Sequence, residues 1–393
     1  MNFRLHRQCY LEIDLDQVKH NFKELRRMAG DKVTLMPAIK ANAYGHGLIM
    51  TCKALQEAGA GLVAVGTIDE AIALRKANVN LRIVIFASNL VVEDTDLYLK
   101  WNLIPTVMYE FQAQAISDLA ERETPIFLKV ECGRGRLGIN AEEAPALAKK
   151  IAEMKNLRLD GIYTHMAYAG WDSSKKAYPD WQYSRFTKCL DKIKAMGIHI
   201  PFAQLCNTPG SIAYPDYRLT GICPGRGIWG YSPIEIRAGG PALSPVLKSW
   251  KSRLLIVKEV IGGKFGPNAS AIRLDKPRRI GIACGGVADG ISRAQANGGV
   301  VLVHGKRVPV CCPMSLEHTT VDLTDVPDAQ PGDEVVIMGR QENEEITRDE
   351  LVKLWDSPIP YFWTSIPEHV ERVYYRGGDP VAIARGYEIE DLK

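Results

Sequence analysis

Short apolar runs alternate with amphipathic stretches from about residue 33 to residue 225. This alternation is typical of parallel strands joined by helical crossovers. Eight runs are predicted to be strands: Val33–Lys40, Leu62–Thr67, Arg82–Ser88, Ile104–Tyr109, Pro125–Glu131, Leu159–Met166, Phe202–Asn207 and Tyr217–Cys223. Eight is the number of strands that closes a (β/α)8 TIM barrel, so the sequence predicts an α/β barrel here.

The stretches between these runs carry apolar residues at every third or fourth position, which predicts amphipathic helices. The predicted helices are Leu48–Ala58, Asp69–Ala77, Glu110–Ala120, Ala141–Met154 and Trp181–Met196. A further helix is expected over Asp14–Arg27, where apolar residues recur on one face. Helices and strands therefore alternate, as a barrel requires.

The pattern changes after about residue 240, where runs rich in Val and Ile are interrupted by Gly and Pro. The predicted strands are Ser252–Ile261, Pro277–Ala283, Gly299–Pro313, Val321–Leu323 and Asp333–Met338. Such runs are typical of a mostly antiparallel β domain. We therefore predict a barrel over residues 12–238 and a C-terminal β domain made of residues 1–11 and 239–393.

Charge and cysteine content exclude several classes of protein. The net charge of +3 is spread over 393 residues without a basic block, so we expect no nucleic-acid partner. No apolar run is long enough to span a bilayer and no signal peptide is recognisable, so we expect no membrane partner and a cytoplasmic location. The nine cysteines form no CxxC pair, which favours reduced thiols and no metal site.

A lysine ends the first predicted strand and opens the string Lys-Ala-Asn-Ala-Tyr-Gly-His-Gly, from Lys40 to Gly47. Barrel enzymes keep their chemistry at the C-terminal ends of the strands. A lysine there can condense with an aldehyde cofactor, and its amine is a local base once substrate releases it. The alternative is a lysine that only ends a strand in water, and the length of the string argues against it.

This string resembles the alanine racemases and their fold-type III relatives. The resemblance covers nearly the whole chain; other matching segments are Glu12–Leu15, Leu128–Gly138, Thr164–His165, Asn207–Thr208, Pro224–Gly225, Gly230–Pro233, Ala288–Gly290, Val321–Asp325 and Gly332–Val335. It implies a barrel that binds pyridoxal 5'-phosphate (PLP) followed by a β domain, and an amino-acid substrate. It also implies a homodimer in which the β domain of one subunit completes the active site of the other.

The resemblance implies roles for individual residues. Lys40 would carry PLP, and Arg136 would face the cofactor phenolate and the substrate carboxylate, which suits a guanidinium. Lys129 matches a lysine that is carbamylated in some members. The remaining cofactor-binding candidates are Tyr44, His165, Asn207, Thr208, Cys223, Gly225, Arg226 and Tyr361.

Four positions depart from the family pattern. The catalytic tyrosine of Gly-Tyr-(Ala/Gly)-Asp-Gly aligns with Val287, which cannot take a proton, and the arginine that faces the pyridine nitrogen aligns with Cys223. The Cys-Met-Asp-Gln run aligns with Ser315–His318, and the C-terminal tyrosine aligns with Pro360, beside Tyr361. A thiol or thiolate at position 223 would allow a protonated pyridine and a stronger electron sink.

Three functions are consistent with these departures. We favour an amino-acid racemase or epimerase whose second base is His318 or Glu317. The second is an enzyme that works on one face of the substrate, such as a decarboxylase, aldolase, dehydratase or transaminase on a D-configured or unusual amino acid. The third is a PLP-binding protein without turnover. Arg134, close to Arg136, hints at an acidic substrate group, although we favour a solvated loop arginine at this position.

Overall fold

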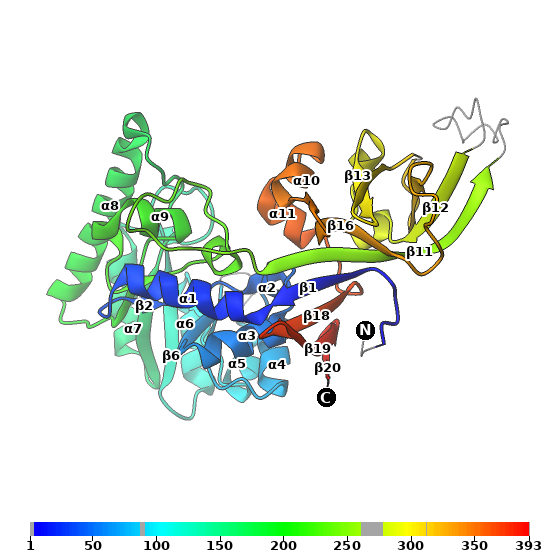
Figure 1. Cartoon of the computed structure of the whole chain (residues 1–393). Helices are drawn as coiled ribbons and strands as arrows, with labels where there is room; N and C mark the ends of the chain where they lie inside the picture. Colours follow the sequence, from blue (N-terminus) through cyan, green and yellow to red (C-terminus); the bar gives the residue numbers. More distant parts are fainter. Residues whose placement is uncertain (1–3, 87–90, 261–277, 312, 393) are drawn as a thin grey trace. The chain divides into compact units, whose positions relative to one another are not determined.

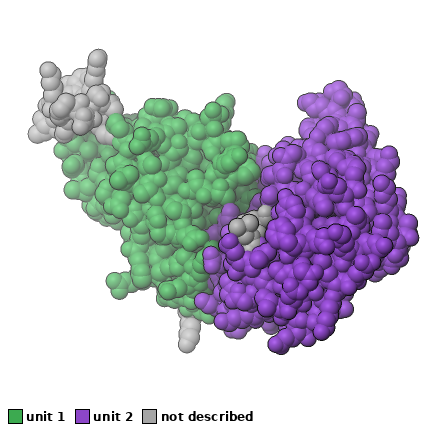
Figure 2. Space-filling view, turned by 180° about the vertical axis from the view of Figure 1, so that it is seen from behind, with its two compact units in different colours: residues 1–16, 44–47, 246–393 green, residues 17–43, 48–245 purple. Residues whose placement is uncertain are grey.

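The chain forms two compact units. The computed structural model describes residues 4–86, 91–260, 278–311 and 313–392. One unit, here called the barrel unit, comprises Gln17–Ala43 and Leu48–Pro245; the other, the β unit, comprises Met1–Asp16, Tyr44–Gly47 and Val246–Lys393 (Figure 2). The ends predicted at Ser88, Ile261 and Pro277 lie outside the described residues.

The barrel unit contains a closed ring of parallel strands. The ring strands are β2 (Thr34–Leu35), β3 (Leu62–Val65), β4 (Arg82–Ile85), β5 (Thr106–Val107), β6 (Thr124–Glu131), β8 (Leu157–Tyr163), β9 (Phe202–Gln204) and β10 (Gly221–Ile222). One sheet has the order β2-β10-β9-β8-β6-β5, and β3 pairs with β4. Parallel bridges Ala38–Ala64 and Val84–Ile104 join the two sheets into a ring. The predicted (β/α)8 barrel is confirmed.

The barrel helices, labelled in Figure 1, are α1 (Leu15–Ala29), α3 (Leu48–Glu57), α4 (Ile68–Lys76), α5 (Thr95–Lys100), α6 (Glu110–Leu119), α7 (Ala144–Glu153), α8 (Ala177–Ala195) and α9 (Thr208–Ala213). Sequence patterns missed the two six-residue helices α5 and α9, which are too short to show a helical period. α7 begins three residues later than predicted, with Pro145 in its first turn, where proline loses no hydrogen bond.

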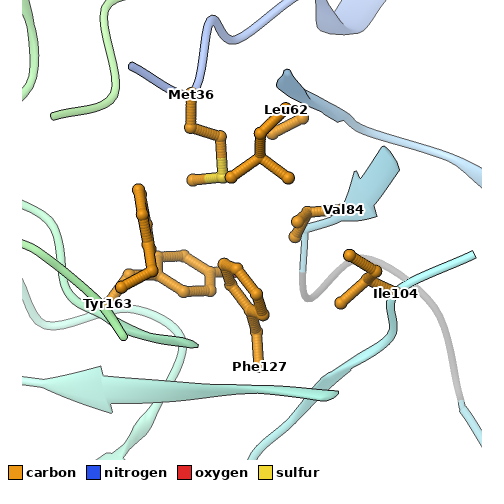
Figure 3. Packing of buried hydrophobic residues seen from close by; sticks show 8 residues of the cluster. Met36, Leu62, Val84, Ile104, Phe127 and Tyr163 are labelled. Carbon is orange, nitrogen blue, oxygen red and sulfur yellow. The ribbon is translucent and has the colours of Figure 1, made fainter. Parts of the chain in front are cut away.

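The interior of the barrel is filled with side chains. Buried residues from nearly every strand form one cluster, and Figure 3 shows six of them labelled: Met36, Leu62, Val84, Ile104, Phe127 and Tyr163. Phe127 and Phe202 are large enough to require glycine neighbours. A Cβ atom on Gly161 would lie 2.5 Å from the Phe127 ring, and one on Gly221 would lie 2.3 Å from the Phe202 ring. The barrel is therefore a packed core, and any site must lie at an end of its strands.

The β unit is built on one large sheet with the order β14-β13-β16-β11-β1-β18-β19-β20. Its strands are β1 (Tyr10–Asp14), β11 (Leu247–Val260), β12 (Arg278–Cys284), β13 (Val300–Val303), β14 (Lys306–Pro309), β15 (His318–Asp322), β16 (Glu334–Gln341), β17 (Glu344–Ile346), β18 (Glu371–Arg376), β19 (Asp379–Arg385) and β20 (Glu388–Asp391). Only β1 and β18 pair in parallel among the described strands of this unit. The predicted mostly antiparallel domain is confirmed.

Several elements of the β unit were not predicted. They are the strands β1, β17, β18, β19 and β20 and the helices α10 (Arg348–Leu354) and α11 (Ile359–Thr364). The structure also has β7 (Ile139–Asn140), which pairs with β6 in the barrel unit. Along the described part of the chain, no helix has the length and apolar character needed to cross a membrane.

Candidate active site

The backbone turns sharply at Lys40. Ala41, Asn42 and Ala43 have φ angles of 53°, 52° and 55°, and Tyr44 follows with 53°. These angles are left-handed, which costs roughly 1–2 kcal/mol for each residue that has a Cβ atom. Such a conformation persists only where neighbouring groups fix it, and it is common at functional sites.

A buried carboxylate, Glu70, fixes this turn. One of its oxygens accepts the amide of Asn42 at 2.8 Å, and the other accepts the amide of Gly66 at 2.8 Å. The Asn42 side chain in turn accepts the amide of Leu48 at 2.7 Å. Sequence reasoning missed Glu70, although Thr67-x-x-Glu70 after a strand is a capping-box signal, and both of its hydrogen bonds are present at α4. Glu70 therefore ties the turn after Lys40 to the start of α4.

The amine of Lys40 lies over an aromatic surface at the C-terminal ends of the strands. Its Nζ is 5.7 Å from the centre of the Phe86 ring, and Phe86 is 5.8 Å from the Tyr163 ring. The Nζ of Lys129 lies 4.4 Å above the same Tyr163 ring. Within the described residues, Lys40 makes no hydrogen bond or ion pair, so its amine is available for chemistry.

This end of the barrel is strongly cationic. Burial, together with the positive charges of Lys129, Arg136, Arg134 and Lys40, lowers the pKa of His165 to about 3. The imidazole is therefore neutral at physiological pH. Burial, assisted by the charge of Arg136, lowers the pKa of Lys129 to about 7. An excess of positive charge around a neutral histidine suits an anionic ligand.

Cys223 lies beside these amines and packs against the barrel core. Burial raises the pKa of its thiol to about 12, and the charges of Lys40 and Lys129 oppose that rise only in part. Of the two forms considered from the sequence, thiol and thiolate, the thiol is therefore the form present at neutral pH. Position 223 carries no charge.

The loop that follows β6 wraps around a carboxylate. Glu131 accepts the amide of Gly133 and, at 3.1 Å, the amide of Arg136. Burial opposes ionisation of Glu131, but the hydrogen bonds from loop amides outweigh it and lower its pKa. Gly138 closes the loop with a φ of 132°, and a Cβ atom there would lie 2.6 Å from the Val130 carbonyl carbon. The backbone that carries both loop arginines is thus held in place.

Backbone amides at the ends of β9 and β10 can hold an anion. The Thr208 hydroxyl accepts the amide of Gly227 at 3.0 Å, and Asn207 caps α9 by accepting the amide of Gly210 at 3.1 Å. The amides of Gly225 and Arg226 have no hydrogen-bond acceptor among the residues that the structure describes. Unpaired amides beside a buried hydroxyl suit a phosphate. Together with the Lys40 amine, these groups fit PLP.

The β unit holds three of the four segments expected from the sequence to depart from the family pattern; the fourth, Cys223, lies in the barrel unit. The amide of Val287 donates to the Ser315 carbonyl at 2.9 Å, and the amide of Gly285 donates to the Glu317 carbonyl at 2.8 Å. The two altered segments are therefore adjacent. His318 is exposed and begins β15. Two further candidates, Tyr44 and the 68% exposed Tyr361, also belong to this unit.

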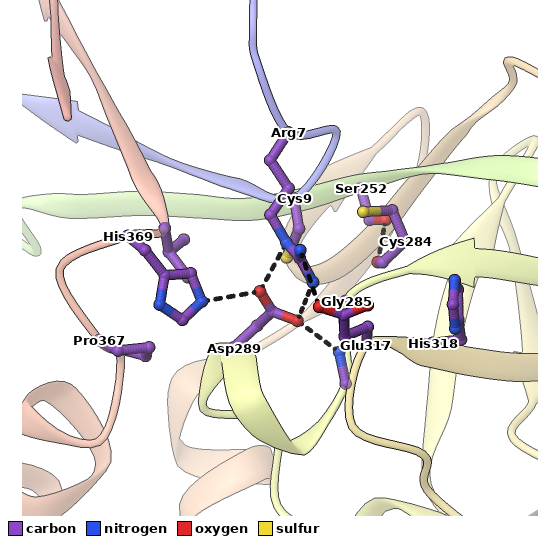
Figure 4. A network of polar contacts seen from close by, with 12 residues as sticks. Arg7, Cys9, Ser252, Cys284, Gly285, Asp289, Glu317, His318, Pro367 and His369 are labelled. Carbon is purple, nitrogen blue, oxygen red and sulfur yellow. Dashed lines mark hydrogen bonds and ion pairs between the residues drawn. The ribbon is translucent and has the colours of Figure 1, made fainter.

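A network of polar contacts centred on the buried Asp289 supports this part of the β unit (Figure 4). The fully buried carboxylate of Asp289 binds the Arg7 guanidinium at 2.8 Å, His369 at 3.2 Å and the amide of Gly286 at 2.8 Å. Arg7 also lies 3.6 Å from the carboxylate of Glu317. This network ties the turn that contains Val287 to the N-terminal segment.

The structure thus divides the predicted site residues between the units. The barrel unit gathers Lys40, Lys129, Arg136, His165, Asn207, Thr208, Cys223, Gly225 and Arg226. The β unit holds Tyr44, Glu317, His318 and Tyr361. The barrel unit carries a lysine at its rim and an anion-binding site at the ends of its last strands, and a β domain follows it. These features define a class of PLP-dependent barrel enzymes.

Comparison with known proteins identifies the family. Residues 13–233 match the alanine racemase N-terminal domain and residues 247–374 match the alanine racemase C-terminal domain. The chain is 32% identical to an alanine racemase of Halothermothrix orenii over 377 residues, covering 95% of this chain and 98% of the relative. It is 34% identical to one of Methanococcus maripaludis over 348 residues, covering 87% and 92%.

Solved structures agree with this match. Alanine racemase from Bacillus anthracis, determined with bound L-Ala-P, superposes with a TM-score of 0.87 at 27% identity, covering 99% of each chain. A Clostridium difficile alanine racemase shares the fold, with a TM-score of 0.89 at 24% identity, covering 97% of this chain and 99% of that one. This chain belongs to the alanine racemase family. The predicted PLP cofactor, amino-acid substrate and isomerase class are confirmed.

Proposed function

We propose that this enzyme racemises or epimerises an amino acid with PLP held on Lys40 and with a second base that is not a tyrosine. When bound, PLP supplies the electron sink that makes the α proton of an amino acid acidic. The observation that carries the proposal is the Lys40 amine, held at the rim by a strained turn and unpaired among the described residues. Gly225, Arg226 and Thr208 would bind the phosphate through amides and a hydroxyl.

The barrel residues divide the work between positioning and proton transfer. Lys40 would remove or return the α proton on one face of the substrate once its amine is released. Arg136, on the loop fixed by Glu131, would bind the substrate carboxylate. Neutral His165 would pack beside the cofactor without adding charge. The Cys223 thiol would leave the pyridine nitrogen without a cationic neighbour at that position.

The second face needs its own acid or base, and Val287 cannot supply one. We propose that Glu317 or His318 takes this role. Glu317 is favoured because its segment is hydrogen-bonded to the turn that carries Val287 and because its carboxylate is oriented by Arg7. A general base contributes roughly 10²- to 10⁴-fold to a rate, so its loss would be readily measured.

Exchange of the α proton in deuterated water tests the proposal. The holoenzyme is incubated with single enantiomers of several amino acids, and the α proton and the optical rotation are followed. Exchange with inversion is expected, and Glu317→Gln should slow inversion by roughly 10²-fold while exchange on the Lys40 face continues. If His318→Gln has that effect and Glu317→Gln does not, the second base is His318.

A second candidate function is favoured by Val287 itself. An enzyme that uses only the Lys40 face, such as a decarboxylase, aldolase, dehydratase or transaminase, needs no residue that exchanges protons at position 287. Exchange with retention, or a new product, in the same experiment would support it. Lys40→Ala should abolish exchange and the visible absorbance of lysine-bound cofactor in either case.

We also propose a cytoplasmic homodimer in which the β unit of one subunit would complete the site of the other. Family membership supports this proposal. Sedimentation velocity of the holoenzyme would test it, and mixing a Lys40→Ala variant with a Glu317→Gln variant would test shared sites. Partial recovery of inversion in the mixture is expected only where the two residues meet across subunits.

A further inference from the structure

The loop after β6 presents two arginines where the proposed reaction needs one. Arg134 and Arg136 are both exposed in the barrel unit. Neither guanidinium has a hydrogen bond or ion pair with any described residue. Surface arginines elsewhere on this unit are commonly paired; Arg185, for example, binds Glu142 through two nitrogens, at 2.7 Å and 2.5 Å. Two unpaired guanidinium groups on one short loop therefore call for a ligand.

The backbone of this loop is held by contacts on both of its sides. Glu131 binds the amides of Gly133 and Arg136 from the inside. From the outside, the Tyr178 hydroxyl donates to the Gly133 carbonyl. The Trp181 ring packs so closely on this glycine that a Cβ atom on Gly133 would lie 2.3 Å from the ring. A loop fixed on both sides loses little backbone conformational entropy when its side chains bind a ligand.

Arg134 belongs to the electrostatic environment of the site. It is one of the four cationic residues whose charges act on His165, together with Arg136, Lys40 and Lys129. Glu131, the carboxylate of this loop, is already committed to backbone amides. Nothing anionic in this loop is therefore left to neutralise Arg134, and the charge is available to a substrate that reaches Lys40.

From this arrangement we infer that Arg134 is a specificity-determining residue that binds a second carboxylate, and that the substrate is a dicarboxylic amino acid. The inference rests on the proposed function, in which Arg136 binds the α-carboxylate. A guanidinium can bind the side-chain carboxylate through two parallel hydrogen bonds, whereas an amide or a methyl group offers no charge to it. Aspartate and glutamate would be preferred over asparagine, glutamine and alanine.

Exchange kinetics of the holoenzyme test the inference with paired substrates. Glutamate and aspartate should exchange their α protons with kcat/KM roughly ten- to a hundred-fold above glutamine and asparagine. In Arg134→Gln this preference should disappear, mainly through a higher KM for the acidic substrates. Arg134→Lys should keep part of the preference, because charge remains and bidentate geometry is lost.

A matched control lies at the other end of the same strand. Arg122 is an exposed arginine that precedes β6, whereas Arg134 follows it, so Arg122→Gln removes the same charge from the opposite end of the barrel. It should leave every ratio unchanged. An Arg134→Gln enzyme that still prefers acidic substrates, or a parent enzyme that prefers neutral ones, overturns the inference.

Binding without reaction separates this inference from the proposed function. Calorimetric titration of the holoenzyme with succinate and glutarate should show binding that Arg134→Gln weakens roughly ten-fold and Arg122→Gln does not, whereas butyrate should bind weakly to all three. Absence of exchange with every amino acid would refute the proposed function and the substrate assignment together. Exchange of neutral amino acids without Arg134-dependent binding of dicarboxylates would refute the substrate assignment alone.

Discussion

Replacing Lys129 by methionine tests the electrostatics of the barrel interior. The lysine is buried beside Tyr163, and its pKa falls from 10.5 to about 7 because burial disfavours the ammonium. At a pH below the folded-state pKa of Lys129, this lysine is protonated in both the folded and the unfolded chain. The folded state is then destabilised by the full free energy of burying the charge. Between the two pKa values the unfolded chain binds more protons, so the stability of the parent protein rises with pH.

The magnitude follows from this difference in proton binding. Each pH unit within the window adds about 1.4 kcal/mol to the free energy of unfolding of the parent relative to Lys129→Met. Between about pH 7 and pH 9 the parent should gain roughly 2 kcal/mol on the variant, since the slope is incomplete near the pKa. Subtracting the free energy of unfolding of the variant from that of the parent cancels the contribution of every group whose titration the substitution does not change.

Urea denaturation across this pH range, followed by circular dichroism in buffers depleted of carbon dioxide, measures the effect. Lys149→Met is the control, because the Lys149 side chain is 63% exposed on α7 in the same unit, and its difference from the parent should not change with pH. A Lys129→Met difference that is equally flat would refute the reasoning. Bicarbonate labelled with ¹³C should give a carbamate signal in the parent that Lys129→Met lacks, because a pKa near 7 leaves the Lys129 amine neutral and reactive.

Three further substitutions test the supports of the site. Asp289→Asn should lower the free energy of unfolding by about 2–4 kcal/mol in urea titrations, because it leaves the 27% exposed Arg7 without its buried partner; an unchanged midpoint would show that the pair contributes nothing. Gly138→Ala should lower the free energy of unfolding by about 2–4 kcal/mol, because the new Cβ atom would sit on a residue with positive φ and lie 2.6 Å from backbone atoms. A variant as stable as the parent would disprove the clash. Glu70→Gln should weaken cofactor retention, read from visible absorbance after dialysis, because a neutral amide cannot accept both amides at once; full retention would remove Glu70 from the site.

The sequence predicted the barrel well because its strands are buried on both faces and therefore read as apolar runs. It failed at β18, where Arg372 interrupts the apolar pattern of a central strand. That arginine is buried, and its guanidinium donates to the carbonyls of Ile366, Pro367, Glu368 and Val370 in the preceding turn and to that of Gly45. A charged residue satisfied by backbone carbonyls has no signature in a hydrophobicity pattern.

The candidate site was predictable where a motif carried it and unpredictable where the fold did. Lys40 and Arg136 stand in strings of residues that are informative by themselves. The support that Glu70 gives to the Lys40 turn joins residues 28 positions apart, and only the folded chain reveals it. The same holds for Cys223, whose sequence context allows a thiol or a thiolate, whereas burial selects the thiol.

The electrostatics of the barrel unit support our proposal that the second base belongs to the β unit. His165 is neutral and the Cys223 thiol is protonated, and neither becomes a better base at physiological pH. Glu131 is bound to loop amides and Lys129 is buried beside Tyr163, which leaves Lys40 as the proposed proton carrier of this unit. A reaction that inverts the α carbon needs a group on the opposite face. If the enzyme inverts its substrate, a residue such as Glu317 must deliver a proton to that opposite face. A variant that lacks this residue must then still exchange the α proton on the Lys40 face while inversion slows.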